Sequence, residues 1–186
     1  MPEAVTVAAN LRQSLLIRVA RIDEAEALSA LCRRSKQHWG YDEGFMARSA
    51  VSLAVLPEAI AAGRVFVARW TDLPDSVLGI AELAPIADGV IDLDKLFVDP
   101  SAIGRGAGAR LFAHAVTEAR QRGARILTIL ADPNAAAFYE RMGARFVRMA
   151  PSDAIPGRQL PFYEFDLSLA DRLSPASPLT DERPRR

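Results

Sequence analysis

Apolar residues change their spacing several times along the chain, and each change predicts a different kind of element. Runs rich in β-branched and aromatic residues, typical of strands, occur at residues 15–20, 64–70, 77–84, 90–98, 126–130, 145–149 and 162–169. Spacings of three and four residues predict helices over residues 23–37, 42–56 and 134–142, and one more long helix that ends at Gly123. The pattern therefore predicts an α/β fold with a mixed central sheet of about seven strands and helices on both faces.

Polar residues and prolines mark where several of these elements begin and end. Asp42 precedes the second helical pattern as an N-cap, and we expect Pro57 to end or interrupt that helix. Asp132 and Pro133 form an N-cap followed by proline at the first helical position, which is a strong signal for a helix start. The run at residues 126–130 is apolar without interruption, as expected for a strand that is covered on both faces.

Residues 96–116, LFVDPSAIGRGAGARLFAHAV, join a strand to the long helix through a loop with Gly104, Gly106 and Gly108. Such a loop gathers free backbone N–H groups at the positive end of a helix dipole, which suits a phosphate. The loop lacks the Gly-Lys-Ser/Thr ending of a Walker loop, and its third glycine comes one residue too early for a dinucleotide fingerprint. Two interpretations stay open at this point, the pyrophosphate loop of an acetyl-CoA-dependent transferase and a glycine-rich turn without a ligand.

The composition is that of one globular domain, with 186 residues of which 50% are apolar and 25% are charged. We expect a flexible N-terminus at residues 1–14, a domain over 15–170 and a disordered tail at 171–186, which is rich in Pro, Ser, Asp and Arg. The net charge of zero gives no reason to expect nucleic acid or an anionic membrane as a partner. No apolar run is long enough to span a bilayer and no signal pattern opens the chain, so we expect a cytoplasmic protein.

Cysteine and histidine are too few for disulfide or metal chemistry. Cys32 is the single cysteine, which excludes an internal disulfide, and its place in a predicted amphipathic helix favours a buried structural thiol. His38 and His114 are far apart in the sequence and match no metal-ligand spacing. The sequence therefore predicts no metal site.

In two motifs and in the order of its elements, the chain resembles the GNAT superfamily of acetyl-CoA-dependent N-acetyltransferases. The cofactor motif of that family, Gln/Arg-x-x-Gly-x-Gly/Ala, reads here Ile103-Gly104-Arg105-Gly106-Ala107-Gly108, with isoleucine in place of the first Gln or Arg. The second motif runs from Asn134 through Tyr139 to Gly143, followed by Ala144 where the family often has Phe. The resemblance covers roughly residues 15–169.

The resemblance implies a binding site for acetyl-CoA along the strand, the glycine loop and the second motif. The six residues of the cofactor motif would hold the pyrophosphate, mainly through backbone N–H groups. Main-chain groups of Leu96, Phe97 and Val98 would bind the pantetheine arm, together with Asn134. Tyr139 would lie against the CoA sulfur as a general acid. From the residues alone, Tyr139 could also be a core aromatic residue, and Asn134 a capping residue of the helix.

Amide formation requires a base that takes a proton from the acceptor amine. The family often has Glu at the position of Asp92, so Asp92 is the first candidate, Asp94 is the second, and Glu82 on the neighbouring strand is a third that would act through water. Strand periodicity puts Asp92, Asp94, Leu96 and Val98 on one face. Each carboxylate could instead be a solvated strand residue, and a chain of waters could replace a dedicated base.

The resemblance places the acceptor where the first two helices and the last strands meet the sheet. The nearby residues of interest are Ser35, Lys36, His38, Trp39 and Tyr41. Trp39 and Tyr41 could form an apolar or cation-binding wall, and Lys36 or Arg34 could bind a carboxylate of the acceptor. Residues 155–158 form a loop that could cover this site. A packed turn between helices, without any ligand, is the alternative.

The leading hypothesis is an N-acetyltransferase that moves an acetyl group from acetyl-CoA directly to an amine of a small molecule, a peptide or a protein. The alternative is a non-catalytic CoA-binding or regulatory module on the same fold, which would tolerate the loss of Tyr139. A third hypothesis is a homodimeric interaction protein, which an exposed apolar edge at residues 162–169 would support. None of the three involves nucleic acid, a membrane or a metal.

Overall fold

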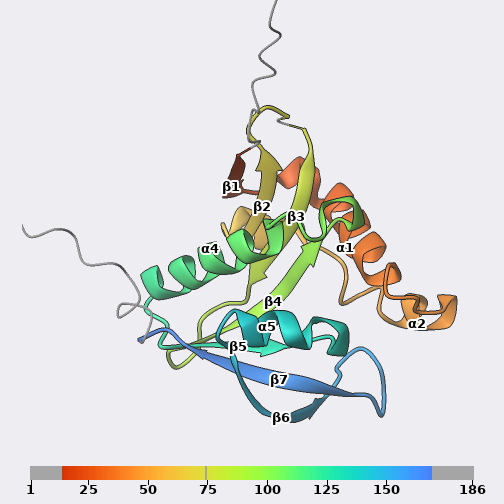
Figure 1. Ribbon diagram of the computed structural model, residues 1–186, viewed down its shortest axis with the longest axis vertical. Helices are drawn as coiled ribbons and strands as arrows, with labels where there is room; N and C mark the ends of the chain where they lie inside the picture. Colours follow the sequence, from red (N-terminus) through yellow and green to blue (C-terminus); the bar gives the residue numbers. More distant parts are fainter. Residues whose placement is uncertain (1–13, 74, 169–186) are drawn as a thin grey trace, which may run out of the picture.

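The computed structural model describes residues 14–73 and 75–168. The flexible N-terminus and the disordered tail expected from the sequence lie outside these residues, apart from Ser14. Seven strands form one sheet in the order β1-β2-β3-β4-β5-β7-β6, in which only β4 and β5 are parallel neighbours (Figure 1). The strands are β1 (Leu15–Val19), β2 (Val65–Trp70), β3 (Val77–Leu83), β4 (Val90–Val98), β5 (Ile126–Leu130), β6 (Arg145–Pro151) and β7 (Gln159–Asp166). The predicted α/β fold with a mixed sheet of about seven strands is confirmed.

The helices follow the predicted order, except that the helix predicted over residues 42–56 ends at Arg48 and an unpredicted short helix begins at Pro57. The α-helices are α1 (Ala25–Gln37), α2 (Glu43–Arg48), α3 (Pro57–Ala61), α4 (Ala107–Gln121) and α5 (Ala136–Arg141), and the 3-10 helices are η1 (Ile22–Glu24), η2 (Pro100–Ala102) and η3 (Pro133–Ala135). Asp42 caps α2 as predicted and accepts a hydrogen bond from the Phe45 amide at 2.7 Å. Pro57 begins α3 and does not end a helix, because its ring suits the first helical position and holds Leu56 in extended backbone.

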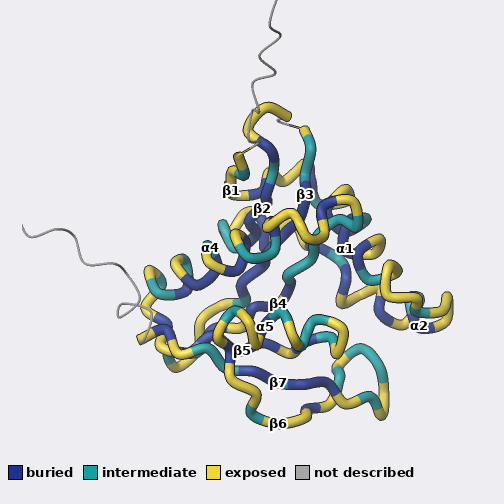
Figure 2. The backbone as a smooth tube through the Cα atoms, in the orientation of Figure 1, coloured by how far each residue is buried: buried dark blue, intermediate teal, exposed yellow. Residues whose placement is uncertain are grey.

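Helices cover both faces of the sheet, and each face has its own core (Figures 1 and 2). On one face, α4 and α5 pack on the sheet, and α4 buries apolar residues at helical spacing, Leu111, Phe112, Ala115, Val116 and Ala119. On the other face, α1 and α3 pack through residues that include Leu28, Leu31, Cys32, Ala59 and Ile60. Cys32 is completely buried, so the prediction of a structural thiol is confirmed.

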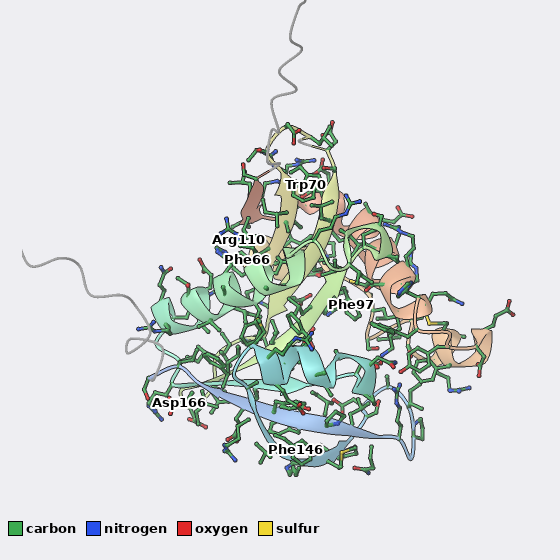
Figure 3. The ribbon with its side chains drawn as sticks, in the orientation of Figure 1. Phe66, Trp70, Phe97, Arg110, Phe146 and Asp166 are labelled. Carbon is green, nitrogen blue, oxygen red and sulfur yellow. The ribbon has the colours of Figure 1, made fainter. Side chains whose placement is uncertain are left out.

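Strand β7 lies between β5 and β6, so it does not supply the exposed apolar edge that would have supported the homodimer hypothesis. Tyr163 of β7 is 1% exposed. The edge strand on this side is β6, which exposes Phe146 and Met149, with Phe146 visible at the rim of the molecule in Figure 3. The homodimer stays a prediction.

Strands β4 and β5 pair only where they begin. Val90 to Asp92 lie opposite Ile126 to Thr128, and the two strands then diverge, since β4 continues to Val98 beside β3 while β5 continues beside β7. The sheet therefore opens in its centre, next to the glycine loop that follows β4.

Candidate active site

A cleft of about 790 Å³ occupies the opening between β4 and β5. The predicted site residues that line it are Ser35, Trp39, Asp92, Asp94, Leu96, Phe97, Val98, Ile103, Gly104, Gly106, Gly108, Asn134 and Tyr139. Five others do not line it. Arg105 lies in the glycine loop and Ala107 begins α4. Glu82 is buried in β3, and Tyr41 contacts the cleft wall through its hydrogen bond to Asp132. His38 lines a separate groove beside α1 and α2.

The glycine loop presents backbone N–H groups to one end of the cleft. Gly104 and Gly106 have φ values of +80° and +85°, and a Cβ at either position would meet no atom within 4 Å. Gly106 is the N-cap of α4, so its own amide and those of Ala107, Gly108 and Ala109 have no acceptor within the helix. Open space beside unpaired N–H groups at a helix N-terminus fits the pyrophosphate of a CoA molecule.

The open edge of β4 presents main-chain groups along the next part of the cleft. The Asp99 amide donates to the carbonyl of Leu78 on β3 at 2.8 Å. Because N–H directions alternate along a strand, the amides of Leu96 and Val98 point to the opposite side, where β5 has diverged. These amides and the neighbouring carbonyls can bind the two amide groups of a pantetheine arm.

A β-bulge in β4 changes which residues share a face, and the expectation that Asp92, Asp94, Leu96 and Val98 lie together is wrong. Leu83 pairs with Leu93 and Glu82 pairs with Lys95, which leaves Asp94 as the extra residue. After the bulge, Leu96 and Val98 pack in the α4 core together with Leu93, while Phe97 packs in the α1 core. A bulge shifts the side-chain alternation by one residue, which explains the difference.

The three candidate bases have different surroundings. Glu82 is 5% exposed and lies 3.2 Å from the ammonium of Lys95, which is itself 7% exposed. Burial raises the pKa of Glu82 in spite of that cation. The other partner of the Lys95 ammonium is Asp94, at 2.5 Å. Asp92 is exposed to the cleft and accepts a hydrogen bond from the hydroxyl of Thr128 on β5. Only Asp92 and Asp94 are therefore in contact with the cleft.

Tyr139 lies in α5 with its ring in the core and reaches the cleft at its edge. The side chain is 5% exposed and its ring contacts Phe112, Phe138 and Tyr163. Burial, together with the negative charge of Asp132, raises the pKa of Tyr139 far above its ordinary value. The hydroxyl makes no hydrogen bond within the described residues. Tyr139 is therefore a protonated donor that a ligand in the cleft can reach.

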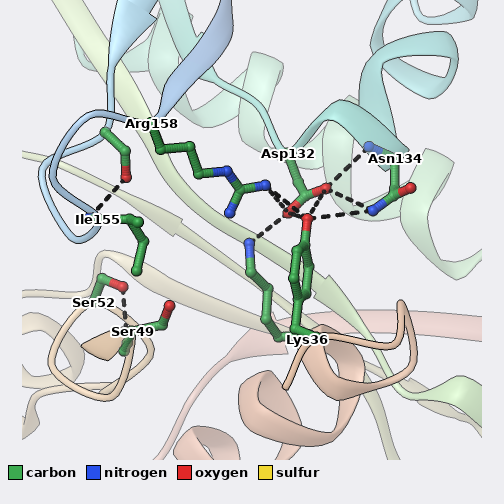
Figure 4. A network of polar contacts seen from close by, with 9 residues as sticks. Lys36, Ser49, Ser52, Asp132, Asn134, Ile155 and Arg158 are labelled. Atoms are coloured by element: carbon green, nitrogen blue, oxygen red, sulfur yellow. Dashed lines mark hydrogen bonds and ion pairs between the residues drawn. The ribbon is translucent and has the colours of Figure 1, made fainter. Parts of the chain in front are cut away.

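Asp132 is the centre of a polar network across the cleft, which the sequence indicated only as a helix cap (Figure 4). It accepts hydrogen bonds from the Lys36 ammonium at 2.5 Å, the Tyr41 hydroxyl at 2.8 Å, and both the backbone and the side chain of Asn134 at 3.0 Å. Burial alone would raise the pKa of the Asp132 carboxyl, but the bonds from Lys36, Asn134 and Tyr41 hold it below its usual value. Arg158, from the loop between β6 and β7, donates to the Tyr41 hydroxyl at 2.7 Å.

Neither cation predicted to bind an acceptor carboxylate is free. Arg34 pairs with Asp99 at 2.8 Å, and Lys36 pairs with Asp132. The sequence pointed to these residues because they are basic, but it gave no signal for the acids that come close to them in the fold. Arg158 lies in the loop 155–158 that was expected to cover the site, but its contact with Tyr41, 117 residues away in the chain, had no signal in the sequence.

Comparison with known proteins agrees with this geometry. Residues 26–144 match the model of the acetyltransferase (GNAT) family. Among solved structures, the PaiA N-acetyltransferase from Thermoplasma acidophilum in complex with coenzyme A is 18% identical, with a TM-score of 0.67 over 82% of this chain and 99% of that one. YncA from Salmonella typhimurium, described as a putative acetyltransferase with its cofactor acetyl-CoA, is 19% identical, with a TM-score of 0.59 over 90% and 99%. No curated protein sequence matches significantly.

No group of three or more His, Cys, Asp or Glu residues is arranged to hold a metal ion in the described part of the chain. In the same residues, no helix is both long and apolar enough to cross a membrane.

The family model spans more than half of the sequence, and the fold and the cleft agree with it. The chain therefore belongs to the GNAT acetyltransferase family and is an acyltransferase.

Proposed function

We propose that this protein transfers an acetyl group from acetyl-CoA directly to the amine of a small acceptor. The observation that carries the proposal is one continuous cleft. At one end lie the unpaired N–H groups of the glycine loop, along it runs the open edge of β4, and beside it lie Asp92 and Tyr139. Groups for the phosphates, for the pantetheine arm and for proton transfer thus follow one another in the order in which a CoA thioester needs them.

Bound acetyl-CoA supplies an activated thioester to this site. The residues present fit it, since Gly104 and Gly106 leave room for the pyrophosphate and the amides of Leu96 and Val98 are open to the arm. Asn134 already donates its side-chain amide to Asp132 at 3.0 Å, so it lines the channel as part of the polar network and leaves its own carbonyl oxygen for a ligand.

Proton transfer is assigned to Asp92 and Tyr139. The acceptor nitrogen loses a proton to Asp92 and forms a bond to the acetyl carbon, the carbon–sulfur bond breaks, and the leaving sulfur takes the proton of the Tyr139 hydroxyl. Asp92 is favoured over Asp94 because the Lys95 ammonium already holds Asp94, whereas Asp92 accepts only a neutral hydroxyl. Glu82 is too deeply buried for this role.

The test is calorimetric titration with acetyl-CoA of the parent protein and of two glycine variants. Gly106→Glu puts a bulky anion where the pyrophosphate is expected, so micromolar binding should be lost. Gly123→Glu is the matched control, because Gly123 caps the other end of α4 with φ +81° and open space around a Cβ, and thus carries the same strain and charge. We expect Gly123→Glu to bind like the parent.

Failure of the folded parent protein to bind acetyl-CoA would overturn the proposal. Equal loss of acetyl-CoA binding in both glycine variants would show that backbone strain, and not a blocked phosphate site, explains the weaker binding. Tight binding without thiol release for any amine would favour the alternative, a non-catalytic CoA-binding module.

A further inference from the structure

Arg158 presents the unused edge of its guanidinium to the cleft. Its Nη2 donates to the Tyr41 hydroxyl at 2.7 Å and lies 3.5 Å from Asp132. Within the described residues, Nε and Nη1 make no hydrogen bond, although the side chain is only 18% exposed. Figure 4 shows the guanidinium reaching from the β6–β7 loop toward Lys36 and Asp132, with only Nη2 joined to the network. A largely buried guanidinium with free N–H groups can donate hydrogen bonds to an anion in the cleft.

Aromatic rings fix the plane of this guanidinium. Its central carbon lies 4.7 Å from the centre of the Phe45 ring and 5.0 Å from that of Tyr41, and the two rings stack at 4.1 Å with an angle of 10°. A guanidinium held over stacked rings is oriented before a ligand arrives, so less freedom is lost on binding.

The space beside the free edge is bounded by a hydroxyl and an apolar side chain. Ser49 is 3% exposed, lines the cleft, and its hydroxyl has no hydrogen-bond partner among the described residues. Ser52 is also nearby, but its hydroxyl already donates a hydrogen bond to the carbonyl oxygen of Ser49 at 2.9 Å. Ile155 lies between these serines and Arg158 in Figure 4. Ser49 therefore adds a neutral donor to the wall of the same cleft, on the other side of Ile155.

Charges along the cleft are separated. At the Arg158 end, the cations Lys36 and Arg158 face the carboxylate of Asp132, which Lys36 already pairs at 2.5 Å, and the exposed Asp153 of the same loop also lines the cleft. Toward β4, the carboxylates Asp92 and Asp94 line the same cleft. A ligand that carries an amine at one end and an anion at the other matches this arrangement, with the amine toward β4.

We propose that the acceptor is a small amine that bears a carboxylate, as an amino acid does, and that the guanidinium N–H groups of Arg158 that Tyr41 does not use bind this carboxylate. The planar fork of a guanidinium matches the two oxygens of a carboxylate. The loop that carries Arg158 also lines the cleft with Ser152 and Ile155, which favours a small molecule over a peptide chain. This inference rests on the proposed acetyl transfer and names its acceptor class.

The test compares acceptors that differ only at the carboxylate. Thiol release from acetyl-CoA is measured for amino acids, their amides and their decarboxylated amines, for example leucine, leucinamide and 3-methylbutylamine, with rates corrected for the fraction of neutral amine. We expect kcat/KM of the best amino acid to exceed those of its two partners by roughly 10- to 150-fold, the range for hydrogen bonds to a charged group. Arg158→Gln should abolish this preference and leave acetyl-CoA affinity unchanged.

Two more variants make the test specific. Arg158→Lys keeps the charge but not the fork, so part of the preference should remain. Arg148→Gln removes an arginine of β6 that also packs on an aromatic ring, Phe162, but does not line the cleft, and it should keep the parental preference. Equal or faster reaction of the amides or decarboxylated amines in the parent, or an unchanged preference in Arg158→Gln, would overturn the inference. Absence of thiol release with every amine, in protein that binds acetyl-CoA, would overturn both this inference and the proposed transfer.

Discussion

Asp92 and Asp94 lie two residues apart on one strand, yet they have different partners. The Lys95 ammonium holds Asp94 at 2.5 Å, while Asp92 receives only the Thr128 hydroxyl. The ammonium already occupies the Asp94 carboxylate, whereas the Asp92 carboxylate keeps lone pairs that an amine in the cleft can reach. This contrast is the reason to assign the base to Asp92.

We therefore expect Asp92→Asn to lower kcat by about 10²- to 10⁴-fold near neutral pH, the usual contribution of a general base. The loss should shrink as the pH approaches ~10, because the acceptor amine is then increasingly neutral without help. The measurement is a pH–rate profile of parent and variant at saturating acetyl-CoA. A deficit that stays constant over the whole pH range would contradict the role of Asp92 as a base.

Tyr139 carries a second prediction. Burial raises its pKa, so the hydroxyl stays protonated throughout the range in which the enzyme can be assayed. We expect Tyr139→Phe to lower kcat with little change in the affinity for acetyl-CoA, and to leave the shape of the pH–rate profile unchanged. Phenylalanine keeps the ring contacts with Phe112 and Phe138, so the stability of the variant serves as the internal control. Unchanged turnover would remove the assigned role.

The bulge in β4 sets the geometry of the strand that borders the cleft, and Lys95 sits beneath it. The ammonium of this buried lysine lies between Glu82 and Asp94, and Glu82 Oε2 has no hydrogen bond among the described residues. Removing the cation leaves the Glu82 carboxylate buried without a partner. We expect Lys95→Met to reduce the free energy of unfolding by roughly 3–5 kcal/mol, measured by urea denaturation.

The matched control for Lys95→Met is the double variant Lys95→Met/Glu82→Leu. It replaces the buried pair by apolar side chains and should recover most of the lost stability, since such replacements are often neutral. If Lys95→Met reduced the free energy of unfolding by less than ~1 kcal/mol, water would have to reach Glu82 after a local rearrangement, and the ion pair would not stabilise the bulge.

Most elements were predictable because each depends on neighbours in the sequence. The spacing of Leu111, Phe112 and Ala115 specifies the buried face of α4, and the run at residues 126–130 specifies a covered strand. The bulge at Asp94 was not predictable, because it depends on how β3 and β4 pair and not on the alternation within β4.

The site also has a part that depends on local sequence and a part that depends on contacts between distant segments. The glycine loop is local and was visible in the sequence, since two of its glycines adopt positive φ values at a helix start. The acceptor end of the cleft depends on contacts such as those of Arg158 with Tyr41 and of Lys36 with Asp132, which join distant segments. Basic residues near a predicted site could be named from the sequence, but their partners could not.

The Asp132 network connects parts of the molecule that the sheet does not join. Lys36 comes from α1, Tyr41 from the segment before α2, Arg158 from the β6–β7 loop, and Asp132 from the turn after β5 (Figure 4). Because β4 and β5 have diverged at this level, these bonds join the two sides of the open sheet across the cleft. The acceptor end of the site should therefore lose its shape when the network is broken.

The charge of Asp132 makes this connection sensitive to acid. The pKa of Asp132 is lowered in the folded protein, so its stabilising contribution is present above the unfolded pKa of ~3.9 and is lost as the pH falls through the lower folded value. We expect Asp132→Asn to cost about 1.5–3 kcal/mol of unfolding free energy at pH 7, and to differ less from the parent near pH 3, as measured by urea denaturation. Asp153→Asn is the control, since Asp153 is exposed on the β6–β7 loop and has no ion pair among the described residues. A difference between parent and Asp132→Asn that is the same at both pH values would mean that the shape of the side chain, and not its charge, joins the two sides of the cleft.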